Sequence, residues 1–340
     1  MTIQLSTITF TDEDDIVPLF EEDAIVNKYT ANTLGGNDLI TGTTITGSDN
    51  FGIWNSGTIN TGAGHDIIIG ICDENHPWIP NAAIRSDGGT IYTDDGNDII
   101  IGTSQAYDGI FIISRATINT GDGNDQIIGS AIGSGIDVNS ESIIDTGNGN
   151  DAITGIGSHG VSNSFIINTG DGDDKITGIG TIVNSGTMDT GAGNDEITGT
   201  SANGWGISSG YVSIIDTGDG DDKITGTGSI GISNNGIIKT GNDQDSIIAD
   251  GGFNGISGSV FLENGKDYLK GFGSGFFDGG DGEDTLELTS GSYIFWISAA
   301  GVAFIKNNIT MRTVGFEKLI AGSTNYDFTS LTQGQTIIVA

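Results

Sequence analysis

Aspartate residues recur along the chain directly after a turn rich in glycine, and they are the side chains best placed to do chemistry. The turn is regular in Thr61-Gly62-Ala63-Gly64-His65-Asp66, where the aspartate holds the sixth position. The same position in later turns holds Asp98, Asp125, Asp151, Asp174, Asp195, Asp222, Asp245, Asp267 and Asp284, and a weaker copy ends at Asp38. Glycine allows φ > 0, and such a turn leaves carbonyl oxygens beside one carboxylate. Hard oxygen ligands in a flexible array suit calcium.

A single turn offers too few oxygens for a calcium ion, whereas two stacked turns offer carbonyl oxygens and an aspartate from each. An alternative is that the aspartates are present only because Asp-Gly sequences reverse the chain. That alternative explains the residue type but not the fixed sixth position. Stacked aspartates about 4.8 Å apart would also repel one another without a cation between them. The pattern therefore favours calcium binding.

The elements that position these turns are predicted by an apolar residue two places after each aspartate. These residues are Ile40, Ile68, Ile100, Ile127, Ile153, Ile176, Ile197, Ile224, Ile247, Leu269 and Leu286. Successive aspartates lie 17 to 32 residues apart, which fits coils that share one turn but carry loops of different length. A second recurring motif, such as Gly52-Ile53-Trp54-Asn55, predicts a second stack of buried apolar side chains inside the solenoid. We expect an all-β, parallel β-helix or β-roll-like solenoid of about ten coils, each with three short strands.

One turn carries a family resemblance. The segment Gly279-Gly280-Asp281-Gly282-Glu283-Asp284-Thr285-Leu286-Glu287 matches the nonapeptide G-G-x-G-x-D-x-U-x at every position. The chain therefore resembles the RTX (hemolysin-type) calcium-binding repeat family, and within it the cyanobacterial RTX-like proteins with long, irregular repeats. Most other turns have Thr in place of the first Gly. The stronger departures are Leu34, Asp94, Asp243 and the pair Leu262-Glu263, each of which weakens its turn.

The resemblance implies several calcium ions held between neighbouring turns, with the ten aspartates from Asp66 to Asp284 as carboxylate ligands. It assigns the turn backbone to the same sites, at Gly62, Gly64, Gly121, Gly123, Gly147, Gly149, Gly170, Gly172, Gly191, Gly193, Gly218, Gly220, Gly280 and Gly282. The family's β-roll has two calcium edges, but this chain has only one such motif in each coil. We therefore expect one row of ions along one edge.

Three segments are expected along the chain. Residues 1–23 form an acidic N-terminal cap, which we expect to be flexible from Asp12 to Asp23, and residues 24–287 form the calcium-binding solenoid. Residues 288–340, denser in aromatic side chains, are expected to close the solenoid as a β-rich cap. Their last residues, from Asp327 to Ala340, resemble the uncleaved signal of type I secretion, although a final β-strand of the cap would have the same sequence. Secretion agrees with millimolar calcium outside cells.

The composition of the chain limits the classes of molecule that it could bind. The chain has 45 acidic and 11 basic side chains and a formal net charge of -34, which disfavours nucleic acids and anionic membranes. No stretch reaches the ~20 apolar residues of a membrane span, and the N-terminus lacks the pattern of a Sec-type signal. Cys72 is the only cysteine, which excludes an intramolecular disulfide framework.

No catalytic constellation is visible in the sequence, and we expect no enzyme. His65, His76 and His159 lie in different coils, and no nucleophile or zinc-hydrolase motif is present. The longest insertion, residues 71–92, contains Cys72, His76, Trp78 and Arg85 and is the first candidate for a ligand surface. The alternative is that this loop packs its own Trp against the solenoid.

Ice binding by an array of threonines is disfavoured. Thr154, Thr177, Thr198 and Thr225 align, but they form a single file beside charged residues such as Lys175. The leading hypothesis is a non-enzymatic, calcium-folded, secreted or surface protein that presents its solenoid to a protein or polysaccharide partner. The alternatives are a calcium-bound scaffold that serves a biosynthetic enzyme, and an adhesin that binds carbohydrate. The sequence predicts no oligomeric state.

Overall fold

The fold consists almost entirely of β-strands. The computed structural model describes residues 2–17, 23–44, 50–73 and 81–340, where the helical turns are η1 (Leu5–Thr7) and η2 (Phe328–Ser330). Contacts divide the chain into two units, Met1–Ile182 (unit 1) and Val183–Ala340 (unit 2), which are described separately. Parallel strand pairing dominates both units, so the prediction of an all-β parallel solenoid is confirmed.

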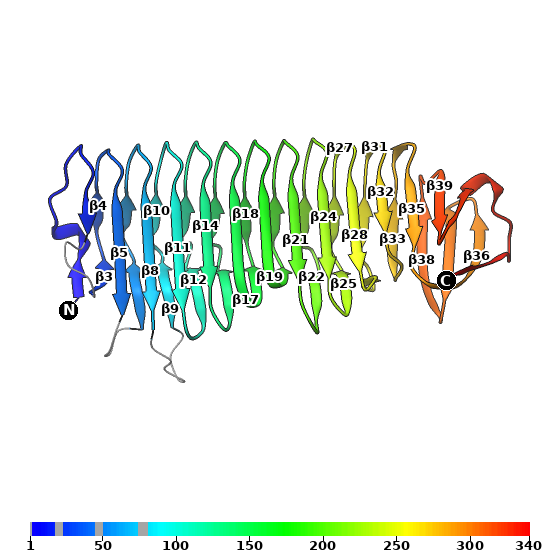
Figure 1. The fold of residues 1–340 in the computed structure, drawn as a ribbon, viewed down its shortest axis with the longest axis horizontal. Coiled ribbons are helices and arrows are strands. Elements are labelled where there is room, and N and C mark those ends of the chain that lie inside the picture. The colour runs from blue at the N-terminus through cyan, green and yellow to red at the C-terminus, as the bar shows by residue number, and fades with distance from the viewer. Residues whose placement is uncertain (1, 18–22, 45–49, 74–80) are drawn as a thin grey trace. The chain divides into compact units, whose positions relative to one another are not determined.

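A coil of unit 1 contains three strands, and each pairs in parallel with a strand of the next coil. β5 (Leu39–Thr44), β6 (Phe51–Asn55) and β7 (Thr58–Asn60) are followed by β8 (Ile67–Cys72), β9 (Ala82–Asp87) and β10 (Thr90–Tyr92). The register aligns Ile40 with Ile68, Ile53 with Ile84, and Ile59 with Ile91. The glycine-aspartate turns of unit 1 consequently lie in a row along one edge (Figure 1).

The same order continues through the rest of unit 1. The strands are β11 (Ile99–Ser104), β12 (Asp108–Ile113), β13 (Thr117–Asn119), β14 (Gln126–Ser130), β15 (Ser134–Val138), β16 (Ile143–Asp145), β17 (Ala152–Asn163) and β18 (Ile166–Asn168). β17 serves as the first and second strand of its coil, because its first half pairs with β14 and its second half with β15. The boundary between the units falls within β19 (Lys175–Asn184).

The core of unit 1 contains the apolar ladders that the sequence predicts. The side chains two places after the aspartates are at most 1% exposed, namely Ile40, Ile68, Ile100, Ile127, Ile153 and Ile176. Each such burial contributes about 1.5 to 3 kcal/mol. The first two strands of a coil approach closely where they contain glycine, because a Cβ added to Gly42 would lie 2.3 Å from the carbonyl oxygen of Gly52.

The N-terminal segment already belongs to the solenoid. β1 (Thr2–Gln4) pairs in parallel with β3 (Ala24–Asn27), and β2 (Ile16–Val17) pairs in parallel with β5. β4 (Thr30–Asn32) then pairs with β7. Strand pairing with the repeats thus starts before residue 24, at β1 and β2, while the domain boundary predicted at residue 24 stays a prediction.

Unit 2 repeats the three-strand coil. Its strands up to the last complete repeat turn are β20 (Thr187–Asp189), β21 (Glu196–Thr200), β22 (Trp205–Ser209), β23 (Ile214–Asp216), β24 (Lys223–Thr227), β25 (Ile230–Asn234), β26 (Ile237–Lys239), β27 (Asn242–Asp243), β28 (Ser246–Asp250), β29 (Phe253–Asn254), β30 (Ser259–Phe261), β31 (Asn264–Gly265), β32 (Tyr268–Lys270), β33 (Gly275–Asp278), β34 (Asp281–Gly282) and β35 (Thr285–Leu288). The turns themselves pair through β27, β31 and β34. Ile197, Ile224, Ile247, Leu269 and Leu286 are fully buried and continue the predicted apolar ladder in this unit.

A small antiparallel sheet follows the last repeat. β36 (Gly291–Ser298) pairs with β37 (Gly301–Lys306) and β41 (Thr336–Val339), and β37 pairs with β38 (Ile309–Val314). β39 (Lys318–Ala321) pairs in parallel with β35 and antiparallel with β40 (Thr324–Asp327). The rings of Phe295 and Phe304 are fully buried and meet edge to face, with centroids 5.1 Å apart. The segment that resembles a secretion signal, residues 327–340, contains the helical turn η2 and the strand β41, and its role in export stays a prediction.

Candidate metal centre

The sixth-position aspartates form a hydrogen-bonded row in each unit. Within each unit, the Oδ1 atom of one aspartate accepts a hydrogen bond from the backbone N–H of the aspartate that precedes it. In unit 1 this joins Asp38 N to Asp66, Asp66 N to Asp98, Asp98 N to Asp125, Asp125 N to Asp151 and Asp151 N to Asp174, over 2.7–2.8 Å. In unit 2 it joins Asp195 N to Asp222, Asp222 N to Asp245, Asp245 N to Asp267 and Asp267 N to Asp284, over 2.8–2.9 Å. The row fixes one carboxylate oxygen at each step.

The second carboxylate oxygen is what makes this row a candidate metal centre. Every aspartate of the row is at most 2% exposed. Among the residues that the structure describes, the buried Oδ2 atoms without a hydrogen-bond partner include those of Asp38, Asp66, Asp98, Asp125, Asp151, Asp222, Asp245, Asp267 and Asp284. Buried carboxylates are normally paired, hydrogen-bonded or bound to metal, because an uncompensated charge there is very costly. These oxygens therefore call for a proton or a cation.

Burial strongly affects the protonation of the row. It raises the pKa of Asp66, Asp125 and Asp284 to about 6, of Asp98, Asp245 and Asp267 to about 7, and of Asp222 to about 8. Loss of solvent is the largest cause, and the negative charge of neighbouring acids is a further cause at each of these residues. The hydroxyl of the turn's first threonine, such as Thr61 beside Asp66, and the preceding backbone N–H both act in the opposite direction where they are present, and lower the pKa.

A pH prediction follows for the chain without calcium. The pKa values of the row rise on folding from about 3.9, so the folded chain binds more protons than the unfolded chain between about pH 4 and pH 8. Its stability is therefore expected to fall as pH rises through the folded pKa values of about 6 to 8. In EDTA, the chain should be folded at pH 5.5, and its melting temperature should fall as the pH is raised towards 8.5. A melting temperature that rises with pH over this range would contradict the burial of these carboxylates.

The glycines of the turns are required by the close stacking of the coils. A Cβ added to Gly64 would lie 1.6 Å from the carbonyl oxygen of Gly36, and one on Gly123 would lie 1.4 Å from that of Gly96. The same clash occurs in unit 2, where a Cβ on Gly220 would lie 1.7 Å from the Gly193 oxygen. These distances explain the glycines without any metal. Their assignment to a calcium site therefore stays a prediction.

The turns that depart from the repeat keep its backbone conformation. The second position of the turn, which Gly62 holds in its own turn, is taken elsewhere by Leu34, Asp94 and Glu263, with φ of 78°, 56° and 67°. The fourth position, which is glycine in the other turns, is taken by Asp243 with φ of 85°. These are left-handed conformations that cost non-glycine residues about 1–2 kcal/mol. The row of aspartates nevertheless continues through all four turns.

A second row, which sequence reasoning missed, runs through the fifth position of the turns. In unit 1, the backbone N–H of His65 donates to Asn37 Oδ1, that of Asn97 to His65 Nδ1, and that of Asn124 to Asn97 Oδ1, each over 2.8 Å. In unit 2, Gln244 N–H donates to Asp221 Oδ1 over 2.9 Å. The sequence contains a signal for this row, because most fifth positions hold Asn, Asp or His, whose side chains accept hydrogen bonds over a short reach.

The N-terminal acids take the same two positions. Asp15 N–H donates to Asp38 Oδ1 over 2.8 Å, and Asn37 N–H donates to Asp14 Oδ1 over 2.7 Å. Asp14 and Asp15 thus act as the fifth and sixth positions of a turn that has no glycine. These hydrogen bonds join the two residues to the first repeat, and the expectation that the segment from Asp12 to Asp23 is flexible stays a prediction.

Other candidate groups do not assemble into a site. Nowhere in the described part of the chain do three or more His, Cys, Asp or Glu side chains converge as metal ligands, so a cation on the row would need backbone oxygens as well. In the insertion at residues 71–92, Cys72 is buried, Arg85 forms an ion pair with Asp87 over 3.2 Å, and His76 and Trp78 lie outside the described residues.

The fold and the buried row together define a β-helical solenoid with a candidate cation edge. A solved structure is similar to this chain, that of a hyperactive, Ca2+-dependent, beta-helical antifreeze protein from an Antarctic bacterium. The two chains are 18% identical, with a TM-score of 0.52 over 84% of this chain and 77% of the other. This similarity supports the β-helical fold.

Sequence comparisons add no family. No protein-family model matches the chain, and no curated protein matches its sequence. The likeness to RTX repeats consequently stays a resemblance of motifs. In the described residues, no helix is long and apolar enough to cross a membrane.

Proposed function

We propose that the chain is a calcium-binding, non-catalytic β-solenoid that acts outside the cell or at its surface as a structural or interaction protein. The observation that carries this proposal is the row of buried aspartates with an unpartnered carboxylate oxygen at step after step. A proton could satisfy one such oxygen, but a repeated row beside stacked carbonyl oxygens fits a series of divalent cations better. The Ca2+-dependence of the similar antifreeze protein supports calcium as the ion.

Calcium would be held by the residues of two successive turns. The carboxylates of Asp66, Asp98, Asp125, Asp151, Asp174, Asp195, Asp222, Asp245, Asp267 and Asp284 would supply charge, and the carbonyl oxygens of the turn glycines would complete the oxygen shell. The role of calcium is to neutralise the row and so to stabilise the stacking of the coils. Such a role suits the exterior of cells, where calcium is abundant.

Diffraction from crystals grown in calcium tests this proposal directly. An anomalous difference map should contain a row of peaks, each beside an Oδ2 atom of the aspartate row. A map with no peak beside these atoms would overturn the assignment of calcium to the row.

A second candidate function is ice binding through one face of unit 1. The outward side chains of β5, β8, β11 and β14 are Leu39, Thr41, Thr43, Ile67, Ile69, Ile71, Ile99, Ile101, Thr103, Gln126, Ile128 and Ser130. None of them is charged, in a chain of net charge -34, and their strands pair in register. The charged residues that disfavoured ice binding in the sequence begin only at Lys175 on this ladder.

The ice-binding candidate has a specific test. In calcium, the chain should lower the freezing point without lowering the melting point to the same extent, and Ile69→Lys should reduce this gap strongly because it places a charge in the centre of the face. Thr58→Lys, an outward position on β7 in another strand ladder, is the matched control and should keep the gap. No gap in the unmodified protein would exclude this candidate while leaving the calcium proposal intact.

A further inference from the structure

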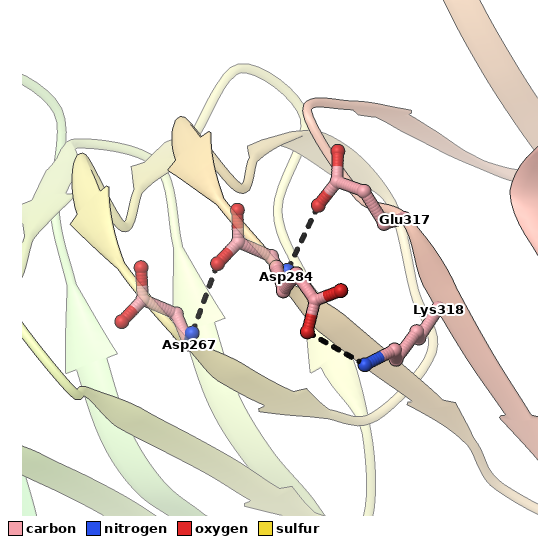
Figure 2. Close-up of polar contacts among 5 residues, drawn as sticks. Asp267, Asp284, Glu317 and Lys318 are labelled. Carbon is pink, nitrogen blue, oxygen red and sulfur yellow. Dashed lines mark hydrogen bonds and ion pairs between the residues drawn. The ribbon is translucent and has the colours of Figure 1, made fainter.

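The last step of the aspartate row in unit 2 is made by a glutamate from the C-terminal cap. Asp284 N–H donates to Glu317 Oε2 over 2.8 Å, which is the bond that each earlier backbone N–H makes to an aspartate Oδ1 (Figure 2). Glu317 directly precedes β39, whose first residue Lys318 pairs in register with Thr285. Because Thr285 directly follows Asp284, Glu317 holds the sixth position of an additional turn.

The segment before Glu317 has further properties of a repeat turn. Gly315 has φ of 76°, and a Cβ added to Gly279 would lie 2.5 Å from the Gly315 carbonyl oxygen. Gly279 N–H also donates to the Val314 carbonyl oxygen over 2.9 Å. Two places after Glu317, the fully buried Leu319 pairs with Leu286 and continues the apolar ladder. The cap thus stacks on the solenoid through a turn that has the conformation of a repeat turn but not the glycine-aspartate motif.

The carboxylate that faces this added turn is buried and unsatisfied. Asp284 is fully buried, its Oδ1 accepts the Asp267 N–H, and its Oδ2 has no hydrogen-bond partner among the described residues. Figure 2 shows the carboxylates of Asp267, Asp284 and Glu317 in a row, and the oxygens of Asp284 and Glu317 that carry no dashed line are directed to the same side. Lys318 does not neutralise Asp284, because its ammonium group pairs with Glu283 over 2.9 Å.

We propose that Asp284 and Glu317 hold a terminal calcium ion that fixes the C-terminal cap to the solenoid. This inference rests on the proposed function, since it extends the calcium row by one site. Carbonyl oxygens of the turn at residues 279–284 would complete the shell, as in the earlier turns. The consequence is that calcium controls the folding of the cap as well as the stacking of the repeats, although the cap has no glycine-aspartate motif of its own.

The variant Glu317→Gln tests the terminal site. The amide keeps an oxygen that can accept the Asp284 N–H but removes the negative charge. In calcium, native mass spectrometry should count one ion fewer than in the unmodified protein. Hydrogen exchange of residues 291–339 should rise to the rate seen in EDTA, while exchange in the earlier coils of unit 2 stays slow. Glu283→Gln makes the same change of charge on an exposed neighbour, and it should leave the ion count and the exchange of the cap unchanged.

The outcomes separate this inference from the proposed function. An unchanged ion count and unchanged exchange in Glu317→Gln, with many ions bound, would overturn the terminal site only. An unmodified chain that binds no calcium would overturn both. If Glu283→Gln and Glu317→Gln loosened the cap equally with no loss of an ion, the contact would be purely electrostatic and the terminal site would be wrong.

Discussion

Removal of calcium at pH 8.5 is expected to unfold most of the solenoid. The aspartates of the row are buried and mostly ionised at this pH, and charges about 4.8 Å apart repel by roughly 3 kcal/mol for each neighbouring pair at an effective dielectric constant near 20. The summed repulsion of several such pairs in each unit exceeds the roughly 5–15 kcal/mol by which a domain is usually stable. We therefore expect that the burial of the apolar side chains is not enough to keep the coils folded at this pH without a cation.

The measurement is circular dichroism in EDTA and in millimolar calcium. The strand signal should be lost in EDTA and return when calcium is added in excess. Potassium chloride at matched ionic strength should restore little, because screening acts weakly on buried charges. Magnesium should also restore little, because it demands a regular octahedral shell and gives up water reluctantly. Superimposable spectra and melting curves in EDTA and calcium would contradict this account.

The second large effect is expected from Asp98→Asn in the middle of the row of unit 1. The asparagine keeps Oδ1 as an acceptor for Asp66 N–H, but it replaces the charged, unpartnered Oδ2 with an amide nitrogen that cannot bind a cation. In calcium, the variant should lose about 3 kcal/mol of stability, the usual size for removing one partner of a buried charge pair. In EDTA at pH 5.5, where the row is largely protonated and the chain is expected to stay folded, the same substitution should change the stability little, because Asp98 is then neutral like the asparagine.

The loss of the destabilising effect in EDTA is the diagnostic result. Asp95→Asn is the matched control, since Asp95 lies in the same turn on the exposed side and the change of charge is identical. It should alter the unfolding free energy by less than about 0.5 kcal/mol in either condition. Denaturant unfolding in calcium, and in EDTA at pH 5.5, measures all four values. If Asp98→Asn were equally destabilising in both, the aspartate would act only through hydrogen bonds.

The repeating parts of the structure could be predicted from the sequence because the same residue types recur at the same positions of each coil. Ile68 and Ile100 are fully buried two places after their aspartates, as the period requires, and the sixth-position aspartates form one row in each unit. These features depend on local turn chemistry and on strand alternation, which both leave a readable pattern in the chain.

The ends of the solenoid could not be predicted in the same way. Asp15 and Glu317 both take the place of a ladder aspartate, but neither follows a glycine pair, and Glu317 is a different residue type. Their roles come from the register of β2 on β5 and of β39 on β35, which is set by strand pairing far away in sequence. The row at the fifth position was missed for another reason. His65 serves there through Nδ1, so residue identity alone conceals the shared function.

The calcium row is tested most directly by titrating the metal-free chain with calcium while heat and circular dichroism are recorded on the same sample. The account predicts about eight to ten coupled ions, with binding and the gain of strand signal following one common transition. A single weak site, or binding that is complete without any change in structure, would contradict it.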